Sequence, residues 1–230
     1  MPHSLDVPED DESLYLIVGE TADDTRPVNQ GDVFRGITLP GFPEDDHRLI
    51  ILTTHPCSLR AGPRLRPRLQ ASPVNRSQYL PPEQWAHSYL RQMPLPALVD
   101  DQHHMVTLTE AGIVTPEQLV AAERIAVLSE AGILLLQQRL VWALAHAVVG
   151  RDTLADYSAP AFAEIELLEE WNRGLCAADE ADRPARLTAI AQQFEEYIRA
   201  SGLQAQLADG TMRGDARRLV RDELRRRQQQ

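Results

Sequence analysis

The chain has 230 residues, 43% hydrophobic and 25% charged, which is enough for one large soluble domain or two small ones. Its formal net charge is −11, and such an acidic protein is a poor general binder of nucleic acid, because phosphate contacts need local positive charge. The chain contains no lysine, since all 23 basic residues are arginine. This excludes a Walker-type phosphate loop, a Schiff-base lysine and a lysine general base within the chain.

Residues 1–12 are predicted to form a disordered acidic arm, and they lack the pattern of a signal peptide. The longest apolar segment, residues 133–150, is interrupted by polar side chains, so we expect no membrane span. The two cysteines, Cys57 and Cys176, make no disulfide framework, which fits a reducing compartment. We therefore expect a cytoplasmic protein.

The N-terminal half is predicted to be rich in strands, because short apolar or alternating runs are separated by glycine, proline and polar residues. The predicted strands cover residues 14–18, 32–37, 49–53, 64–74 and 105–108. A helix over residues 82–93 should end before two prolines, Pro94 and Pro96. A second helix should begin at Pro116, with Thr115 as its N-cap.

From Ser129 onward, the spacing of the apolar residues is helical. Helices are predicted over residues 129–150, 160–177 and 182–202, followed by an amphipathic, arginine-rich tail from Asp215. Residues 124–128 suit either a continued helix or a last strand, because Ile125 and Val127 allow both. We therefore divide the chain into an acidic arm (1–12), a barrel-like domain (13–128), a helical domain (129–210) and a basic amphipathic tail (211–230).

His55, Pro56 and Cys57 follow a predicted strand and include residue types that are found in zinc sites. Their spacing matches no close pair of zinc ligands, so we predict no metal and no cofactor. A buried Cys57 after the strand is one interpretation. The other is a nucleophile that His55 activates, although a position two residues away along a strand does not place the imidazole well.

A cluster of arginines follows, and its members are the predicted binding residues: Arg60, Arg64, Arg66, Arg68 and Arg76. On an extended segment the middle three share one face, because side chains repeat every two residues. Three guanidinium groups there suit phosphate or the acidic surface of a partner, and the protein's own acidic arm is an equally good partner.

One part of the chain resembles a known family. Its features are Gly-Asp-Val-Phe at 31–34, Arg48 directly before the apolar run 49–52, and Ala-Ser-Pro-Val-Asn at 71–75. In these features the segment resembles the opening of the MazF/PemK toxin barrel, an SH3-like fold. In that family an arginine and a hydroxyl residue serve RNA cleavage, so the resemblance implies Arg48 as a catalytic residue. Asn75 stands where the family has a threonine.

The sequence therefore predicts an α+β protein, with an SH3-like small β-barrel followed by a C-terminal helical region. We interpret it as a non-enzymatic assembly protein that binds a protein partner or itself through the helical half. The helices that carry Trp142, Phe162 and Trp171 need more cover than one short bundle provides. The resemblance implies an accessory role in a prokaryotic toxin–antitoxin or phage-defence system. The alternative is an endoribonuclease or nucleic-acid-binding module that uses Arg48 and the arginines at 60–76.

Overall fold

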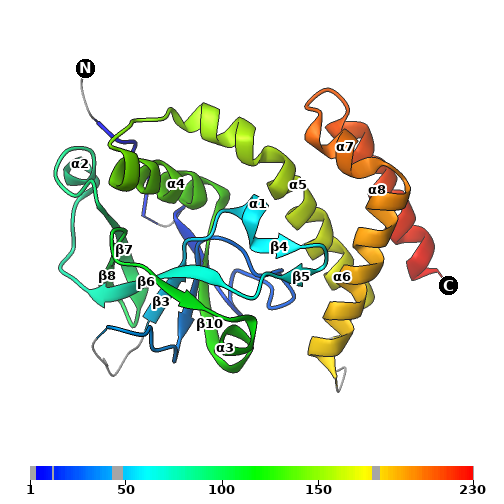
Figure 1. The fold of residues 1–230 in the computed structure, drawn as a ribbon, viewed down its shortest axis with the longest axis horizontal. Helices are drawn as coiled ribbons and strands as arrows, with labels where there is room; N and C mark the ends of the chain where they lie inside the picture. Colours follow the sequence, from blue (N-terminus) through cyan, green and yellow to red (C-terminus); the bar gives the residue numbers. More distant parts are fainter. Residues whose placement is uncertain (1–3, 12, 43–48, 178–181, 230) are drawn as a thin grey trace. The chain divides into compact units, whose positions relative to one another are not determined.

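The computed structural model describes residues 4–11, 13–42, 49–177 and 182–229. Within these residues, the N-terminal half forms a curled antiparallel sheet and the C-terminal half forms helices (Figure 1). The mixed α+β class is therefore confirmed. No described helix combines the length and the apolar character that crossing a bilayer requires.

Tertiary contacts divide the chain into two compact units. Unit 1 comprises Met1–Ala22, Asn29–Leu59 and Arg66–Asp156, and unit 2 comprises Asp23–Val28, Arg60–Leu65 and Tyr157–Gln230. The division differs from the predicted domains in two respects. The main change of unit comes after residue 156 and not after 128, and two short segments of the N-terminal half join the helical unit.

In the described residues, the sheet of unit 1 has eight strands, and all of their pairings are antiparallel. Their order is β1 (Tyr15–Ile17), β10 (Glu123–Leu128), β2 (Asp32–Arg35), β3 (Leu49–Leu52), β6 (Leu69–Arg76), β8 (Gln102–Thr107) and β7 (Gln92–Val99), while β9 (Gly112–Val114) also pairs with β6. Strand β3 is buried along its whole length, as its Leu-Ile-Ile-Leu sequence predicts. The predicted strands at 14–18, 32–37 and 49–53 are confirmed to within two residues.

Helix α4 (Glu130–Ala145) packs against β7 and β10. The hydroxyl of Ser129 accepts a hydrogen bond from the Gly132 N–H, so the predicted N-cap is confirmed. A Cβ atom at Gly132 would lie 2.2 Å from the Leu14 carbonyl oxygen. Glycine therefore lets the first turn of α4 approach the backbone that leads into β1.

Arg139, in the middle of α4, is fully buried and ties four segments of unit 1 together. Its Nη1 atom donates to the carbonyl oxygens of Tyr89 and Gln92, at 3.1 and 3.2 Å. Its Nη2 atom donates to those of Trp85 and Asp6, at 3.1 and 3.4 Å. Burial lowers the pKa of Arg139 to about 10, so the side chain remains a cation at neutral pH.

Residues 4–11 contact the rest of unit 1, which differs from the predicted disordered arm. Leu5 is buried, and its N–H donates to the Ala86 carbonyl. The Asp6 N–H donates to Oε1 of Gln138 at 2.7 Å, and Nε2 of Gln138 donates to the Asp6 carboxylate at 3.2 Å. The acidic composition favours disorder, but one apolar side chain and three backbone hydrogen bonds anchor the segment.

The helix predicted over 82–93 is wrong in its extent. Helix α2 (Pro82–Trp85) has a single turn, and the chain enters β7 at Gln92. Pro94 and Pro96 therefore lie inside a strand and do not end a helix. Strand β7 is at the edge of the sheet, where proline is tolerated because one side of the strand needs no ladder donors.

Helix α3 (Pro116–Ala121) confirms the predicted start, since Thr115 and Gln118 form a reciprocal capping box. Strand β10 follows at Glu123, so the open alternative at residues 124–128 is resolved as a strand. Arg124 in this strand pairs with the buried Asp32 of β2 at 3.1 Å.

Unit 2 is built from helices α5 (Arg151–Leu175, which begins in unit 1), α6 (Arg183–Ala200), α7 (Leu203–Ala208) and α8 (Arg213–Gln228). Helix α5 begins nine residues earlier than predicted and continues through Pro160. Trp171 is fully buried in the core of this unit, 5.4 Å from the Phe194 ring and under the Arg227 guanidinium. The helical half therefore covers Trp171 itself, and this residue no longer argues for self-association.

The short segment 23–28 belongs to the packing of unit 2. Nδ2 of Asn172, a buried side chain of α5, donates to the Thr25 carbonyl at 2.8 Å. Arg173 pairs with Asp23 at 3.2 Å. The second segment, 60–65, forms the two-stranded hairpin of β4 (Arg60–Ala61) and β5 (Arg64–Leu65).

Candidate functional site

The residue that the resemblance assigns to catalysis, Arg48, lies outside the described residues. The matching hydroxyl position is Asn75 in β6, which is exposed and pairs with Met105 of β8. The described residues therefore provide no geometry for the ribonuclease hypothesis, which stays a prediction.

Arg60, a member of the predicted arginine cluster, has its side chain engaged inside unit 2. Its Nη2 atom donates to the Val28 carbonyl at 2.9 Å, and the residue is half-buried. This contact links the two short segments of unit 2. Arg60 therefore has a structural contact in addition to its predicted binding role.

Arg64, Arg66 and Arg68 are all exposed. Within the described part of the chain, none of their guanidinium groups has a hydrogen bond or an ion pair. The arginines whose ion pairs are described lie outside this cluster: Arg26, Arg35, Arg124, Arg173, Arg183, Arg199, Arg217, Arg218, Arg221, Arg225, Arg226 and Arg227. Residues 66–68 are not in a strand, so the alternation that would align all three side chains is not maintained.

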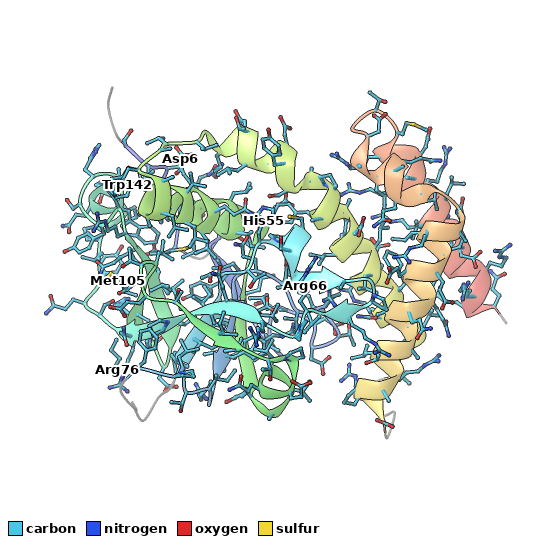
Figure 2. All side chains as sticks on the ribbon, in the orientation of Figure 1. Asp6, His55, Arg66, Arg76, Met105 and Trp142 are labelled. Atoms are coloured by element: carbon cyan, nitrogen blue, oxygen red, sulfur yellow. The ribbon has the colours of Figure 1, made fainter. Side chains whose placement is uncertain are left out.

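Arg76 is not brought together with Arg66 and Arg68. It is the last residue of β6, and a strand rises about 3.3 Å per residue, so roughly 25 Å of strand separates it from Arg68. Figure 2 labels Arg66 and Arg76 at well-separated positions of unit 1. Arg66 and Arg68 therefore do not form one patch with Arg76 in unit 1, while Arg60 and Arg64 belong to unit 2.

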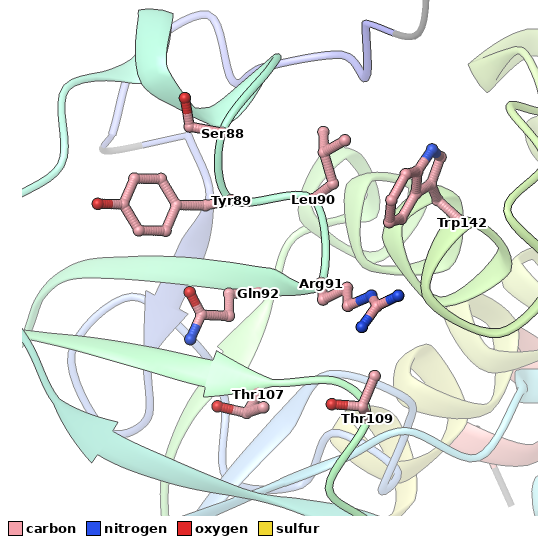
Figure 3. Close-up of a pocket in the computed structure, with 8 residues that line it drawn as sticks. All are labelled: Ser88, Tyr89, Leu90, Arg91, Gln92, Thr107, Thr109 and Trp142. Carbon is pink, nitrogen blue, oxygen red and sulfur yellow. The ribbon is translucent and has the colours of Figure 1, made fainter.

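A pocket of about 460 Å³ lies elsewhere in unit 1, where the loop before β7, the end of β8 and α4 meet (Figure 3). This volume is in the range of ligand-binding sites. Its lining consists of Ser88, Tyr89, Leu90, Arg91, Gln92, Thr107, Thr109 and Trp142. None of these residues is acidic, and the polar ones other than Arg91 present hydroxyl, amide or indole groups.

Arg91 is held in a defined place at this pocket. Its Nη2 atom lies 3.2 Å from Nε2 of His146, and the His146 ring meets the Trp142 ring edge-on at 5.1 Å. Because a guanidinium can only donate, Nε2 of His146 must accept, which requires the neutral imidazole. In Figure 3 the exposed Arg91 side chain extends between Trp142 and Thr109.

The buried cation of Arg139 lies behind the same pocket. Two of its carbonyl acceptors belong to the lining residues Tyr89 and Gln92. These carbonyl dipoles therefore point toward Arg139 and not toward a ligand. Together, Arg91 and Arg139 make the pocket suitable for a carboxylate or another anion.

The sequence does not reveal this pocket, because its pattern predicts one helix over residues 82–93. In a strand-and-loop arrangement, Tyr89 and Arg91 instead meet Trp142 from a distant part of the chain. The available signal is the spacing of Trp142 and His146, four residues apart within the helix predicted over 129–150. In the structure α4 ends at Ala145, and His146 is its C-cap.

Among the described residues, no group of three or more His, Cys, Asp or Glu side chains is placed to hold a metal ion. Comparison with known proteins gives no assignment either, because no protein-family model and no curated protein matches the chain.

Proposed function

We propose that the protein is a non-enzymatic interaction module that binds an acidic segment of a partner protein at the Arg91 pocket. The observation that carries this proposal is the lining itself, in which an oriented arginine stands among aromatic and hydroxyl side chains without an acidic residue. Tyrosine, tryptophan and arginine are the residue types that dominate the energetics of protein interfaces.

A protein partner is favoured over nucleic acid by the charge of the chain. With a net charge of −11, the protein repels a polyanion at long range, and a few arginine–phosphate contacts release few counterions. A short acidic peptide segment carries few charges, so its binding needs positive charge only at the binding site itself. The exposed Arg66 and Arg68, with Arg64 just before them in the chain, are a second candidate contact for an acidic surface.

We also propose, on the resemblance at 31–34 and 49–52, that the curled sheet is an SH3-like barrel of the MazF/PemK kind. Its support is that these residues form β3 and most of β2, which are neighbours in the sheet. A role in a toxin–antitoxin or phage-defence system follows from the same resemblance. In the rival proposal, Arg48 serves RNA cleavage.

The test is a binding titration with three labelled probes: a glutamate-rich peptide with one phenylalanine, the same peptide with glutamine for glutamate, and a single-stranded RNA. We expect binding of the acidic peptide only. Arg91→Gln should weaken it about tenfold or more, because a charge-assisted hydrogen bond contributes about 1.5–3 kcal/mol. Arg218→Gln, at an exposed position of α8, is the matched control and should bind like the wild type.

Two outcomes contradict the proposal. If Arg91→Gln binds the acidic peptide as tightly as the wild type while Arg66→Gln/Arg68→Gln does not, the interaction surface is the exposed arginines and not the pocket. If the wild type cleaves the RNA and Arg48→Ala does not, the protein is a nuclease. The second result would overturn the interaction proposal as a whole.

A further inference from the structure

His55 and Cys57 form a side-chain pair that neither the pocket nor the arginines use. Nδ1 of His55 lies 2.9 Å from Sγ of Cys57. The pair exists because the chain leaves the extended conformation after β3, and Cys57 is the second residue of the short helix α1 (Pro56–Leu59). The interpretation of Cys57 as a buried residue is wrong, since the thiol is exposed.

The backbone on both sides of the pair is anchored. Before it, the Thr54 hydroxyl accepts from the Gln70 N–H at 2.6 Å, and the Thr53 N–H donates to the Gln70 carbonyl at 2.9 Å. After it, Pro56 and Leu59 are buried. Because this turn is fixed, the thiol and the imidazole hold their relative geometry before a reactant arrives. No further conformational entropy is then lost in ordering them at each encounter.

One backbone hydrogen bond indicates that Nε2 of His55, and not Nδ1, carries the ring proton. The backbone N–H of Cys57 donates to Nδ1 of His55 at 3.3 Å, so Nδ1 has its lone pair available. Burial lowers the pKa of His55, which keeps the ring neutral at physiological pH. With Nδ1 as an acceptor, the Cys57 thiol is the donor in its contact with His55, and it shares the Nδ1 lone pair with the Cys57 N–H.

We propose that Cys57 is a site of thiol–disulfide exchange with low-molecular-weight disulfides, and that His55 is its base. The thiol proton moves from Sγ of Cys57 to Nδ1 of His55, and Sγ attacks one sulfur of the disulfide R–S–S–R. The bond between Cys57 and that sulfur forms as the R–S–S–R bond breaks. The departing RS⁻ takes the proton from His55, which leaves a mixed disulfide on Cys57 and one RSH.

The chain contains its own control, because the only other cysteine, Cys176, is buried. The experiment exposes the whole protein to glutathione disulfide or to hydroxyethyl disulfide and follows each cysteine by peptide mass spectrometry. We expect modification of Cys57 with both reagents and none of Cys176 on the same timescale. Equal rates at the two cysteines, or no reaction at Cys57, would overturn the proposal.

His55→Asn separates the base from simple exposure, since asparagine retains an acceptor near Nδ1 but cannot take a proton. Base assistance contributes about 10²–10⁴ in enzyme sites, and we expect at least a tenfold slower reaction of Cys57 at neutral pH. Ser58→Ala, next to the pair, should react like the wild type. A wild-type rate in His55→Asn would contradict the assigned role.

A second measurement covers the case in which His55→Asn does not fold. The reaction rate of wild-type Cys57 should fall less between about pH 8 and 6 than that of free cysteine, whose thiol has a pKa of about 8.5. A pH profile that matches free cysteine would overturn the proposal without any variant.

Discussion

At the scale of single residues, Arg139 is notable because its charged side chain is fully buried in unit 1. A buried guanidinium is costly unless its donors are satisfied. Here four backbone carbonyls accept from the two Nη atoms of Arg139, while its buried Nε atom has no hydrogen-bond partner within the described structure. Its charge also lies behind the Arg91 pocket. One side chain thus joins the N-terminal segment, α2, the loop before β7 and α4.

We expect Arg139→Met to lower the free energy of unfolding by about 3–5 kcal/mol, because buried carbonyls would lose their donor. Urea denaturation measures this loss, with Arg68→Met as the exposed control. Since Arg139 titrates only near pH 10, the loss should be the same from about pH 5 to 9. A loss below about 1 kcal/mol would show that water replaces the guanidinium.

At the scale of elements, the short segment 23–28 contributes to unit 2 through charge as well as packing. Burial raises the pKa of Asp23, but the hydrogen bonds donated by Thr25 and Arg173 outweigh this effect and lower it to about 2. Because the folded-state pKa lies below the ordinary value of 3.8, the ionised carboxylate stabilises the fold above about pH 4. This stabilisation is lost as the pH falls toward 2.

Asp23→Asn should therefore be less stable than the wild type at pH 6, and the difference should shrink steadily between pH 4 and 2. Chemical denaturation at a series of pH values measures it. Asp222→Asn, at an exposed ion pair of α8, is the control for removal of a surface carboxylate. A difference that stays constant down to pH 2 would mean that Asp23 acts by packing and not by charge.

Some elements of the fold can be predicted from the sequence and others cannot. Elements with their own local signals, such as Ser129 before α4 and Thr115 before α3, were predicted at the correct residue. The prolines of β7 were misread, because proline excludes both a helix interior and a central strand but permits an edge strand. Only the position of β7 in the sheet distinguishes these cases.

The candidate sites were harder to predict than the elements. The exposure of Arg66 and Arg68 is expected from their charge. Which other arginines form ion pairs depends on contacts between helices far apart in the sequence, such as those of Arg221 in α8 with Glu166 and Glu170 in α5. The contact of His55 with Cys57 required knowing that a helical turn begins at Pro56.

At the scale of the whole molecule, unit 2 is discontinuous in sequence, since it needs residues 23–28 and 60–65 as well as 157–230. We expect a fragment of residues 157–230 to protect the amides at the end of α5 from hydrogen exchange less than the full chain does. Asn172, for example, would lose the Thr25 carbonyl. Equal protection in the two proteins would show that the helices fold without the inserted segments.

The discontinuity of unit 2 also has a consequence for the order of synthesis. Residues 23–28 and 60–65 leave the ribosome long before the helices that they bind, and translating the remainder takes roughly 10–30 s at about 5–20 residues per second. During that interval the carbonyl of Thr25 and the carboxylates of Asp23 and Asp24 have not yet met Asn172, Arg173 and Arg183. A nascent chain stalled before α5 would therefore present these early segments to chaperones, and unit 2 can be completed only after translation of its last helix.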